Sequence, residues 1–386
     1  MSAEKGFAAV LLLGLLSAAE AGIKTWVAEV PQNWNYNEGW SPAGVPTSAD
    51  DVVFDGTGNG DCNLSGTVEV NSLNVTAAYN GTLALGNHDI NIDAGNATFD
   101  GGYLTSTGGA LVFRASTGTQ TFSPKSGATY PGISKSGAGT VTVATNNLTA
   151  GSLSVSGGTW DWGASTLTHS VTSITTSGSS TMTFGANTVR VSGNVDLSGL
   201  ATLNANSGTL ELNGASAQTF TPMAGATHPT IKQTGTGTTT VATNSLTAQA
   251  VQVIAGTLDF SANALNLTTT GNVTVSGGTL TLTNSDAAVG GDFTVSGGTL
   301  DCPGYSKSFS VAGSFSWTTG NGTLNSGTLT LNGTATGKTL DFTGGSFYNL
   351  TVNGSGGVWT ANTDITLNGS LTLTAGTLDI SANATR

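Results

Sequence analysis

One short loop has the residue types and spacing of a metal-binding site. Residues 55–61 read DGTGNGD, which places side-chain oxygens at positions 1, 3, 5 and 7 of the loop, with Asp55, Asn59 and Asp61 as the candidate ligands. Such spacing, with Gly at the sixth position, is typical of the calcium loop of an EF-hand. The twelfth position is Gly66 instead of the expected glutamate, and no helix is expected on either side. We therefore predict a polar turn, with Ca²⁺ bound by Asp55, Asn59 and Asp61 as the alternative.

The three histidines do not suggest a metal or catalytic cluster. His88, His169 and His228 lie far apart in the chain, which contains neither a Cys/His cluster nor a nucleophile elbow. Metal-assisted hydrolysis and nucleophilic catalysis both need such groups close together. We therefore expect no cofactor, and no metal apart from the alternative above.

Two arginines are expected beside carboxylates: Arg114 near Asp93 or Asp100, and Arg190 near Asp196. Polysaccharide lyases and hydrolases built on β-helices gather several carboxylates with a Lys or Arg on one concave face. Isolated pairs are ordinarily surface ion pairs that contribute little. We predict no catalytic residue and a protein that is not an enzyme. A carbohydrate-active β-helix enzyme, a lyase or a hydrolase, stays as an alternative.

The pair Trp160 and Trp162 has the spacing of a sugar-stacking platform, because residues two apart in a strand project from the same face. Aligned repeats favour another interpretation, since they carry apolar residues at the same two positions. These are Leu258 and Phe260, Leu300 and Cys302, and Leu378 and Ile380. We therefore predict that both tryptophans, and the Cys302 thiol, are buried in the core.

The elements that position these residues belong to a repeat array. Residues 271–280 (GNVTVSGGTL) recur as residues 291–300 (GDFTVSGGTL), and a longer unit, residues 120–150, returns as residues 218–248. A third, more divergent copy covers about residues 328–380. Its offset is longer than the offset between the first two copies by about one short repeat. A period of about 20 residues with Gly and Asn punctuation is typical of a solenoid coil. Length changes in whole coils keep side chains in register.

Local alternation predicts which side chains point inward. In residues 279–283 (TLTLT) and 370–374 (SLTLT) leucines alternate with hydroxyl residues, so Leu lies on one face and Thr or Ser on the other. We predict an all-β, right-handed parallel β-helix (β-solenoid) of about 18 coils, on the order of 85 Å long at about 4.8 Å per coil. Cys62 and Cys302 would then lie too far apart for an intramolecular disulfide.

Three segments are expected along the chain. Residues 1–21 are predicted to be a signal peptide, because the apolar run 7–16 precedes an A-x-A cleavage site at 19–21. Residues 22–65 form an N-terminal cap, and residues 66–386 form the solenoid repeat domain. The apolar run is too short to span a bilayer, so no membrane span is expected in the mature chain. The protein is expected to be secreted or at the cell surface.

Charge excludes two classes of partner. Charged residues make up 8% of the chain and its net charge is −12. Because the ten Lys and Arg residues are scattered, no basic stripe is available to neutralise phosphates, and no nucleic-acid partner is expected. An acidic surface also attracts anionic membranes little.

Aromatic residues gather in the predicted cap, where Trp26, Trp34, Tyr36 and Trp40 lie in a Pro- and Asn-rich stretch. An open solenoid end exposes a strand edge and core side chains, and bulky aromatic residues are suited to cover it. We therefore predict an aromatic plug at the N-terminal end.

Motifs at both ends carry a family resemblance. Near the N-terminal end, the tryptophans are followed by residues 44–54 (GVPTSADDVVF). Later in the chain come the GTL units and residues 350–354 (LTVNG). The chain resembles bacterial and phage-encoded surface parallel β-helix repeat proteins, similar to autotransporter-passenger-like or filamentous-haemagglutinin-like adhesins. The resemblance implies adhesion or surface structure.

The favoured interpretation is a non-enzymatic, extracellular structural or adhesin-like protein that presents outward Thr, Asn and Ser rows to glycans or other surfaces. A phage tail or fibre component is the alternative, and it would form trimers. The sequence stops within a repeat at residues 376–386, which indicates either a fragment of a longer protein or an end that stacks on a partner.

Overall fold

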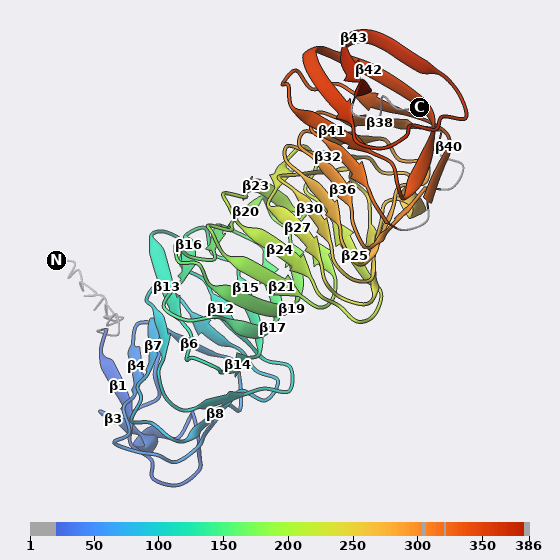
Figure 1. Cartoon of the computed structure of the whole chain (residues 1–386). Helices are drawn as coiled ribbons and strands as arrows, with labels where there is room; N and C mark the ends of the chain where they lie inside the picture. Colours follow the sequence, from blue (N-terminus) through green and yellow to red (C-terminus); the bar gives the residue numbers. More distant parts are fainter. Residues whose placement is uncertain (1–20, 303–305, 320–321, 382–386) are drawn as a thin grey trace, which may run out of the picture.

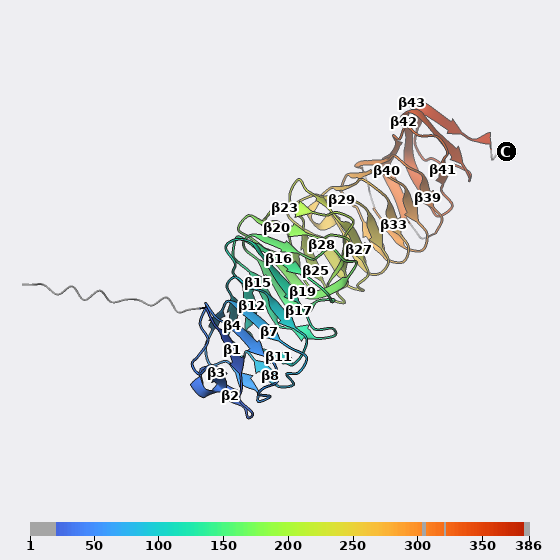
Figure 2. The same cartoon turned by 90° about the vertical axis from the view of Figure 1, so that its left-hand side faces the viewer.

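The chain forms a parallel β-solenoid of about 15 turns, seen in a computed structural model that describes residues 21–302, 306–319 and 322–381. The body is elongated, with the N-terminal coils at one end and β43 at the other (Figure 1), and a view turned by 90° has the same shape (Figure 2). The predicted signal peptide, apart from its last residue, lies outside the described residues. Among those described, no helix is long and apolar enough to cross a membrane.

One long sheet runs along the N-terminal half. Its strands, in spatial order, are β3 (Trp40–Ser41), β1 (Ile23–Trp26), β4 (Asp51–Phe54), β7 (Ser72–Val75), β10 (Ala97–Phe99), β13 (Thr119–Ser123), β16 (Thr140–Val143), β18 (Thr159–Asp161), β20 (Ser180–Thr183) and β23 (Leu200–Asn204). A smaller sheet beside it contains β2 (Gln32–Asn33), β5 (Cys62–Asn63), β8 (Thr82–Ala84) and β11 (Tyr103–Thr105).

The other ladders continue to the C-terminal end. Up to the middle of the rod they contain β6 (Val68–Val70), β9 (Ile90–Ile92), β12 (Ala110–Phe113), β14 (Thr129–Tyr130), β15 (Gly132–Lys135), β17 (Thr149–Val155), β19 (Thr168–Thr176), β21 (Thr188–Val191), β22 (Val195–Asp196), β24 (Thr209–Leu212), β25 (Gln218–Thr221), β26 (Thr227–His228), β27 (Thr230–Gln233), β28 (Thr238–Val241) and β29 (Leu246–Ala248). Beyond it they contain β30 (Val251–Val253), β31 (Thr257–Asp259), β32 (Leu267–Thr269), β33 (Val273–Val275), β34 (Thr279–Thr281), β35 (Ala287–Val289), β36 (Phe293–Val295), β37 (Thr299–Asp301), β38 (Ser308–Val311), β39 (Phe315–Trp317), β40 (Gly322–Leu331), β41 (Lys338–Asp341), β42 (Gly345–Ala361) and β43 (Leu371–Asp379). Among the described residues, two single-turn 3₁₀ helices, η1 (Asn37–Gly39) and η2 (Ser261–Asn263), lie between strands.

Parallel pairing joins equivalent positions of successive coils. Leu280 of β34 pairs with Leu258 of β31 on one side and with Leu300 of β37 on the other, and all three are fully buried. The threonines that precede these leucines pair with one another and stay half-buried. The predicted parallel solenoid, with aliphatic side chains inside and hydroxyls outside, is therefore confirmed.

The coils are longer than the sequence period suggested. Paired strand residues of adjacent coils lie from 19 to 25 positions apart along the rod, and from 28 to 30 positions apart in the first coil. Extra residues enter the loops between strands, so the described chain makes about 15 turns instead of the 18 expected.

An aromatic cluster fills the N-terminal end, as predicted. The rings of Trp26 and Trp40 are 4.9 Å apart, those of Trp34 and Trp40 are 4.8 Å apart, and Phe54 packs beside them. Strand β3 lies antiparallel on the outer edge of β1. Tyr36 was wrongly included in the predicted plug, because its side chain is 41% exposed.

The predicted core positions are buried in the middle of the rod. Trp160 and Trp162 are both fully buried, which confirms that they are not a stacking platform. Cys62 and Cys302 are buried free thiols, as expected without a disulfide. Ile380 and the leucines of residues 370–374 were also predicted to be interior. Ile380, Leu371 and Leu373 are instead 63%, 49% and 59% exposed, because no described coil covers the last strand.

Glycines allow coils to approach one another closely. A Cβ added at buried Gly101 would lie 1.9 Å from the Thr76 carbonyl oxygen of the preceding coil, far inside van der Waals contact. At Gly66, in the turn between β5 and β6, an added Cβ would meet no atom within 4 Å. Gly101 and Gly66 are therefore the same residue type, but only Gly101 packs against the preceding coil.

We predict that Gly101→Ala lowers stability by about 2 kcal/mol, because the coils must separate to admit the methyl group. Gly66→Ala is the matched control, and it should leave the thermal unfolding midpoint unchanged or raise it slightly. Circular dichroism melts of the two variants and the parent chain test this. Equal midpoints for both variants would contradict the coil contact.

Candidate functional site

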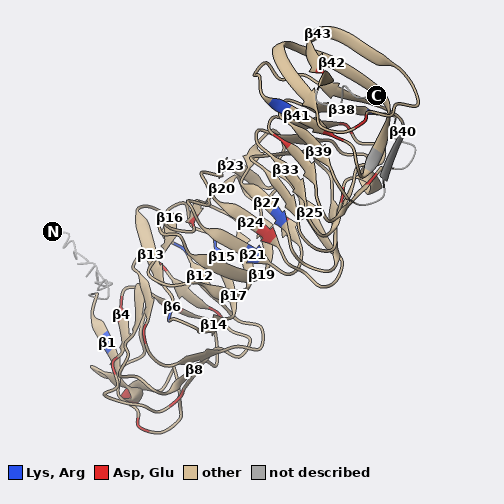
Figure 3. Ribbon diagram, in the orientation of Figure 1, with Lys and Arg blue, Asp and Glu red and all other residues tan. Residues whose placement is uncertain are grey.

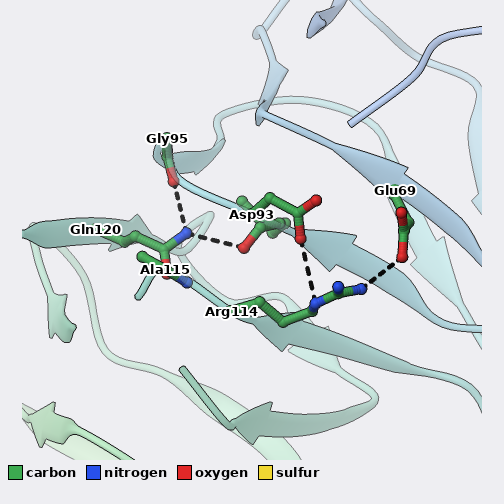
Figure 4. Close-up of polar contacts among 7 residues, drawn as sticks. Glu69, Asp93, Gly95, Arg114, Ala115 and Gln120 are labelled. Atoms are coloured by element: carbon green, nitrogen blue, oxygen red, sulfur yellow. Dashed lines mark hydrogen bonds and ion pairs between the residues drawn. The ribbon is translucent and has the colours of Figure 1, made fainter. Parts of the chain in front are cut away.

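Charged residues are sparse along the rod (Figure 3), and the side chains of Glu69, Asp93 and Arg114 form one cluster (Figure 4). Arg114, which follows β12, donates through Nη1 to Glu69 Oε1 at 2.6 Å, and its Nε lies 3.2 Å from Asp93 Oδ1. The predicted Arg114–Asp93 pair is therefore confirmed, and the alternative partner Asp100 is not the one used. Glu69 was missed because it lies two coils from Arg114, a distance that only a long side chain covers.

The cluster of Glu69, Asp93 and Arg114 is partly shielded from water. Burial raises the pKa of the Asp93 carboxyl, Arg114 opposes that shift, and the negative charge of Glu69 adds to it. Beneath the cluster, buried Gln120 donates from Nε2 to the carbonyl oxygens of Ile92 and Gly95 at 3.0 and 2.9 Å. One guanidinium thus contacts both carboxylates, and the arrangement is that of a surface ion-pair network.

A second cluster follows the coil register directly. Arg190, Glu211 and Lys232 occupy paired positions on β21, β24 and β27, and Glu211 Oε2 lies 3.4 Å from Arg190 Nε and 3.7 Å from Lys232 Nζ. The expected pairing of Arg190 with Asp196 is wrong. Asp196 instead accepts from the backbone N–H and the hydroxyl of Ser198 at 2.9 and 2.6 Å, within its own turn.

The loop at residues 55–61 forms the expected polar turn. Asp55 Oδ1 accepts from the Thr57 N–H at 2.9 Å, and hydrogen bonding from Thr57 lowers the pKa of the Asp55 carboxyl. The Asn59 and Asp61 oxygens accept N–H groups of the next coil at 2.9 and 2.7 Å. The side-chain oxygens of Asp55, Asn59 and Asp61, the alternative Ca²⁺ ligands, thus each accept a hydrogen bond from a different backbone N–H. Within the described ranges, no group of three or more His, Cys, Asp or Glu could hold a metal ion.

Two histidines are core residues. His169 Nδ1 accepts from the Leu148 N–H at 3.0 Å, and its ring lies 5.0 Å from that of Trp162. Burial lowers the pKa of His169 to about 4. His228 Nε2 accepts from the Met223 N–H at 3.0 Å, and burial lowers its pKa too. Both imidazoles therefore satisfy backbone groups inside the coil.

A polar groove crosses the outer face of β4, β7 and β10. This β4–β7–β10 groove has a volume of about 580 Å³. Its lining residues are Asp51, Ser72, Leu73, Asn74, Thr76, Gly95, Asn96, Thr98 and Asp100. Asp51 pairs with Ser72 across the ladder, and Asn74 pairs with Thr98, so the polar side chains follow the coil spacing.

Several side chains of this groove have no hydrogen-bond partner among the described residues. Asn74, Thr76 and Thr98 are half-buried and make no side-chain hydrogen bond to any described residue. Asp51 Oδ1 accepts from Asn71 Nδ2 and Ser72 Oγ at 2.7 and 2.6 Å. Amide and hydroxyl groups at intervals of about 4.8 Å suit a ligand rich in hydroxyl groups. Sequence reasoning predicted such rows without locating this one, although alternation in SLNV (residues 72–75) marks its outward positions.

Comparison with known proteins adds no functional assignment. No protein-family model, no curated protein and no solved structure matches this chain.

We predict that His169 makes the fold sensitive to acid. Its folded pKa of about 4 lies below the unfolded value of 6.5, so the unfolded state takes up a proton first as pH falls. Stability from this residue is complete above pH 6.5 and is lost as pH falls towards 4, by at most about 3 kcal/mol.

Thermal melts between pH 4 and 7 of the parent chain and His169→Gln check this prediction. The glutamine keeps a hydrogen-bond acceptor and does not titrate, whereas all carboxylates titrate alike in both proteins. The parent midpoint should fall more steeply with decreasing pH. Parallel pH profiles would show that the buried imidazole is not responsible.

Proposed function

We propose that this protein is a non-enzymatic, extracellular structural or adhesin-like β-helix rod that presents polar Thr, Asn and Ser surfaces to glycans. The observation that supports this proposal is the β4–β7–β10 groove, where amide and hydroxyl side chains stand in register without internal partners. The strands that carry these groups are already fixed in the ladder before a ligand arrives, so binding costs less entropy than it would for a flexible segment.

Extracellular location is part of the proposal. It is supported by the apolar run of residues 7–16 and the A-x-A site at residues 19–21. A low density of charge also suits a rod that stands among polysaccharides, because hydroxyl and amide groups replace charges as hydrogen-bonding partners.

Glycan-array binding of the purified full-length chain tests the proposal, and we expect binding to a limited set of glycans. The double variant Asn74→Ala/Thr98→Val should weaken that binding at least about tenfold, because it removes the unpaired amide and hydroxyl. Thr279→Val, on an outer face far along the chain, is the control and should bind as the parent does. An array without any bound glycan would refute the proposed function.

A carbohydrate-active enzyme is the second candidate, and the cluster of Glu69, Asp93 and Arg114 favours it. Two carboxylates beside one arginine, one of them with a raised pKa, are groups that glycosidic-bond cleavage uses. The arginine engages both carboxylates, however, which leaves neither poised as a free acid or base.

We predict no release of reducing or unsaturated ends from a panel of soluble polysaccharides. Arg114→Gln and Asp93→Asn serve as matched variants, because both keep a polar side chain of similar size. Turnover by the parent chain that either variant abolishes would make this protein an enzyme and would overturn the preferred function.

A further inference from the structure

Charge in the β4–β7–β10 groove selects among glycans. The described residues that line the groove include two carboxylates, those of Asp51 and Asp100, and no Lys, Arg or His. A hollow surface lined by one sign of charge concentrates its electrostatic potential in the space where a ligand lies. The groove therefore repels anionic glycans and attracts cationic ones.

The coil register sets the two carboxylates at opposite corners of the groove. Asp51 pairs with Ser72 on β7, and Asn74, two residues further along β7, pairs with Thr98 of β10. Asp100 follows Thr98 by two residues. Asp51, Asn74 and Asp100 thus lie on a diagonal across three coils, with steps of about 8 Å and a total span of about 16 Å. A ligand along this diagonal meets a carboxylate, an amide and a second carboxylate.

Both carboxylates keep acceptor capacity for a ligand. Asp51 Oδ1 accepts from Asn71 and Ser72, whereas no described residue donates to its Oδ2. Asp100 is exposed, and its side chain makes no ion pair and no hydrogen bond with any described residue. An ammonium group offers three donors and no acceptor, so it matches such oxygens.

Two cations on neighbouring strands are engaged elsewhere. Lys125 follows β13, the strand next to β10, and its Nζ donates to the Gly102 carbonyl at 3.0 Å and lies 5.0 Å from the Tyr103 ring. Arg114 contacts the two carboxylates of its own ion-pair cluster. Neither cation lines the groove, so the negative charge inside it is left for a ligand to balance.

We propose that the β4–β7–β10 groove binds oligosaccharides of amino sugars, whose ammonium groups pair with Asp51 and Asp100 while Asn74 and Thr98 bind hydroxyl groups. The inference rests on the proposed function and names the class of glycan. Because the two carboxylates are about 16 Å apart, an oligosaccharide reaches both of them and a single sugar does not.

Isothermal titration calorimetry of the full-length chain tests the proposal with three matched probes: the tetrasaccharide of glucosamine, its fully N-acetylated counterpart, and tetragalacturonic acid. A mildly acidic buffer of low ionic strength keeps the amines protonated and the carboxylates ionised. We expect the glucosamine tetrasaccharide to bind about tenfold more tightly than the acetylated one, and tetragalacturonic acid to bind more weakly than either. The preference for the amine should shrink as sodium chloride is added, because salt screens exposed charges.

Three isosteric variants locate the charge that is responsible. Asp51→Asn and Asp100→Asn should each weaken binding of the glucosamine tetrasaccharide about threefold, and together about tenfold, without changing binding of the acetylated one. The unchanged neutral probe shows at the same time that the groove is still folded. Asp301→Asn removes the same charge from an outer position of β37 and is the matched control, which should bind as the parent does.

Each result decides the proposal. Equal affinity of the two tetrasaccharides, tighter binding of tetragalacturonic acid, or equal weakening in Asp301→Asn would overturn it. Binding of other glycans alone, weakened by Asn74→Ala/Thr98→Val, would overturn the amino-sugar class and leave the proposed function standing. An array without any bound glycan, together with no binding of the three probes, would refute both.

Discussion

The parallel hydrogen-bond register between successive coils is the constraint on which the rest of the structure depends. Every strand pair among the described residues is parallel except the pair formed by β1 and β3. A one-residue slip would turn each inward side chain outward, so register ties Leu258, Leu280 and Leu300 into one buried column. The same register sets outward groups such as Asn74 and Thr98 side by side, and the groove follows from it.

Buried polar groups at coil corners obey this register too. Gln120 and Gln218, equivalent in the long repeat, each accept one backbone N–H through Oε1 and donate to two carbonyls from the preceding coil through Nε2. Lys135 takes the place that Gln233 holds in the next copy, and both donate to a glycine carbonyl two residues on. Burial lowers the pKa of Lys135 to about 8, whereas the amide of Gln233 carries no charge into the core.

Alternation and repetition were sufficient to predict the fold and its core, because period-two patterning specifies a face without any knowledge of loops. Trp160 and Trp162 were placed correctly for that reason. Contacts between coils were harder to predict, since they depend on how many residues each loop holds. Arg190 therefore pairs with Glu211 and not with Asp196. The β4–β7–β10 groove escaped prediction because its shape depends on loop paths.

The antiparallel strand β3 affects how one copy of this protein can associate with another. It covers the outer edge of β1 with only two residues and is followed by Pro42, which has no N–H to offer. A further parallel strand docking on this edge would find the Thr25–Trp26 half of β1 already occupied and a proline in its path. At this edge the fold thus disfavours the addition of further strands from other copies, which is how fibrils grow.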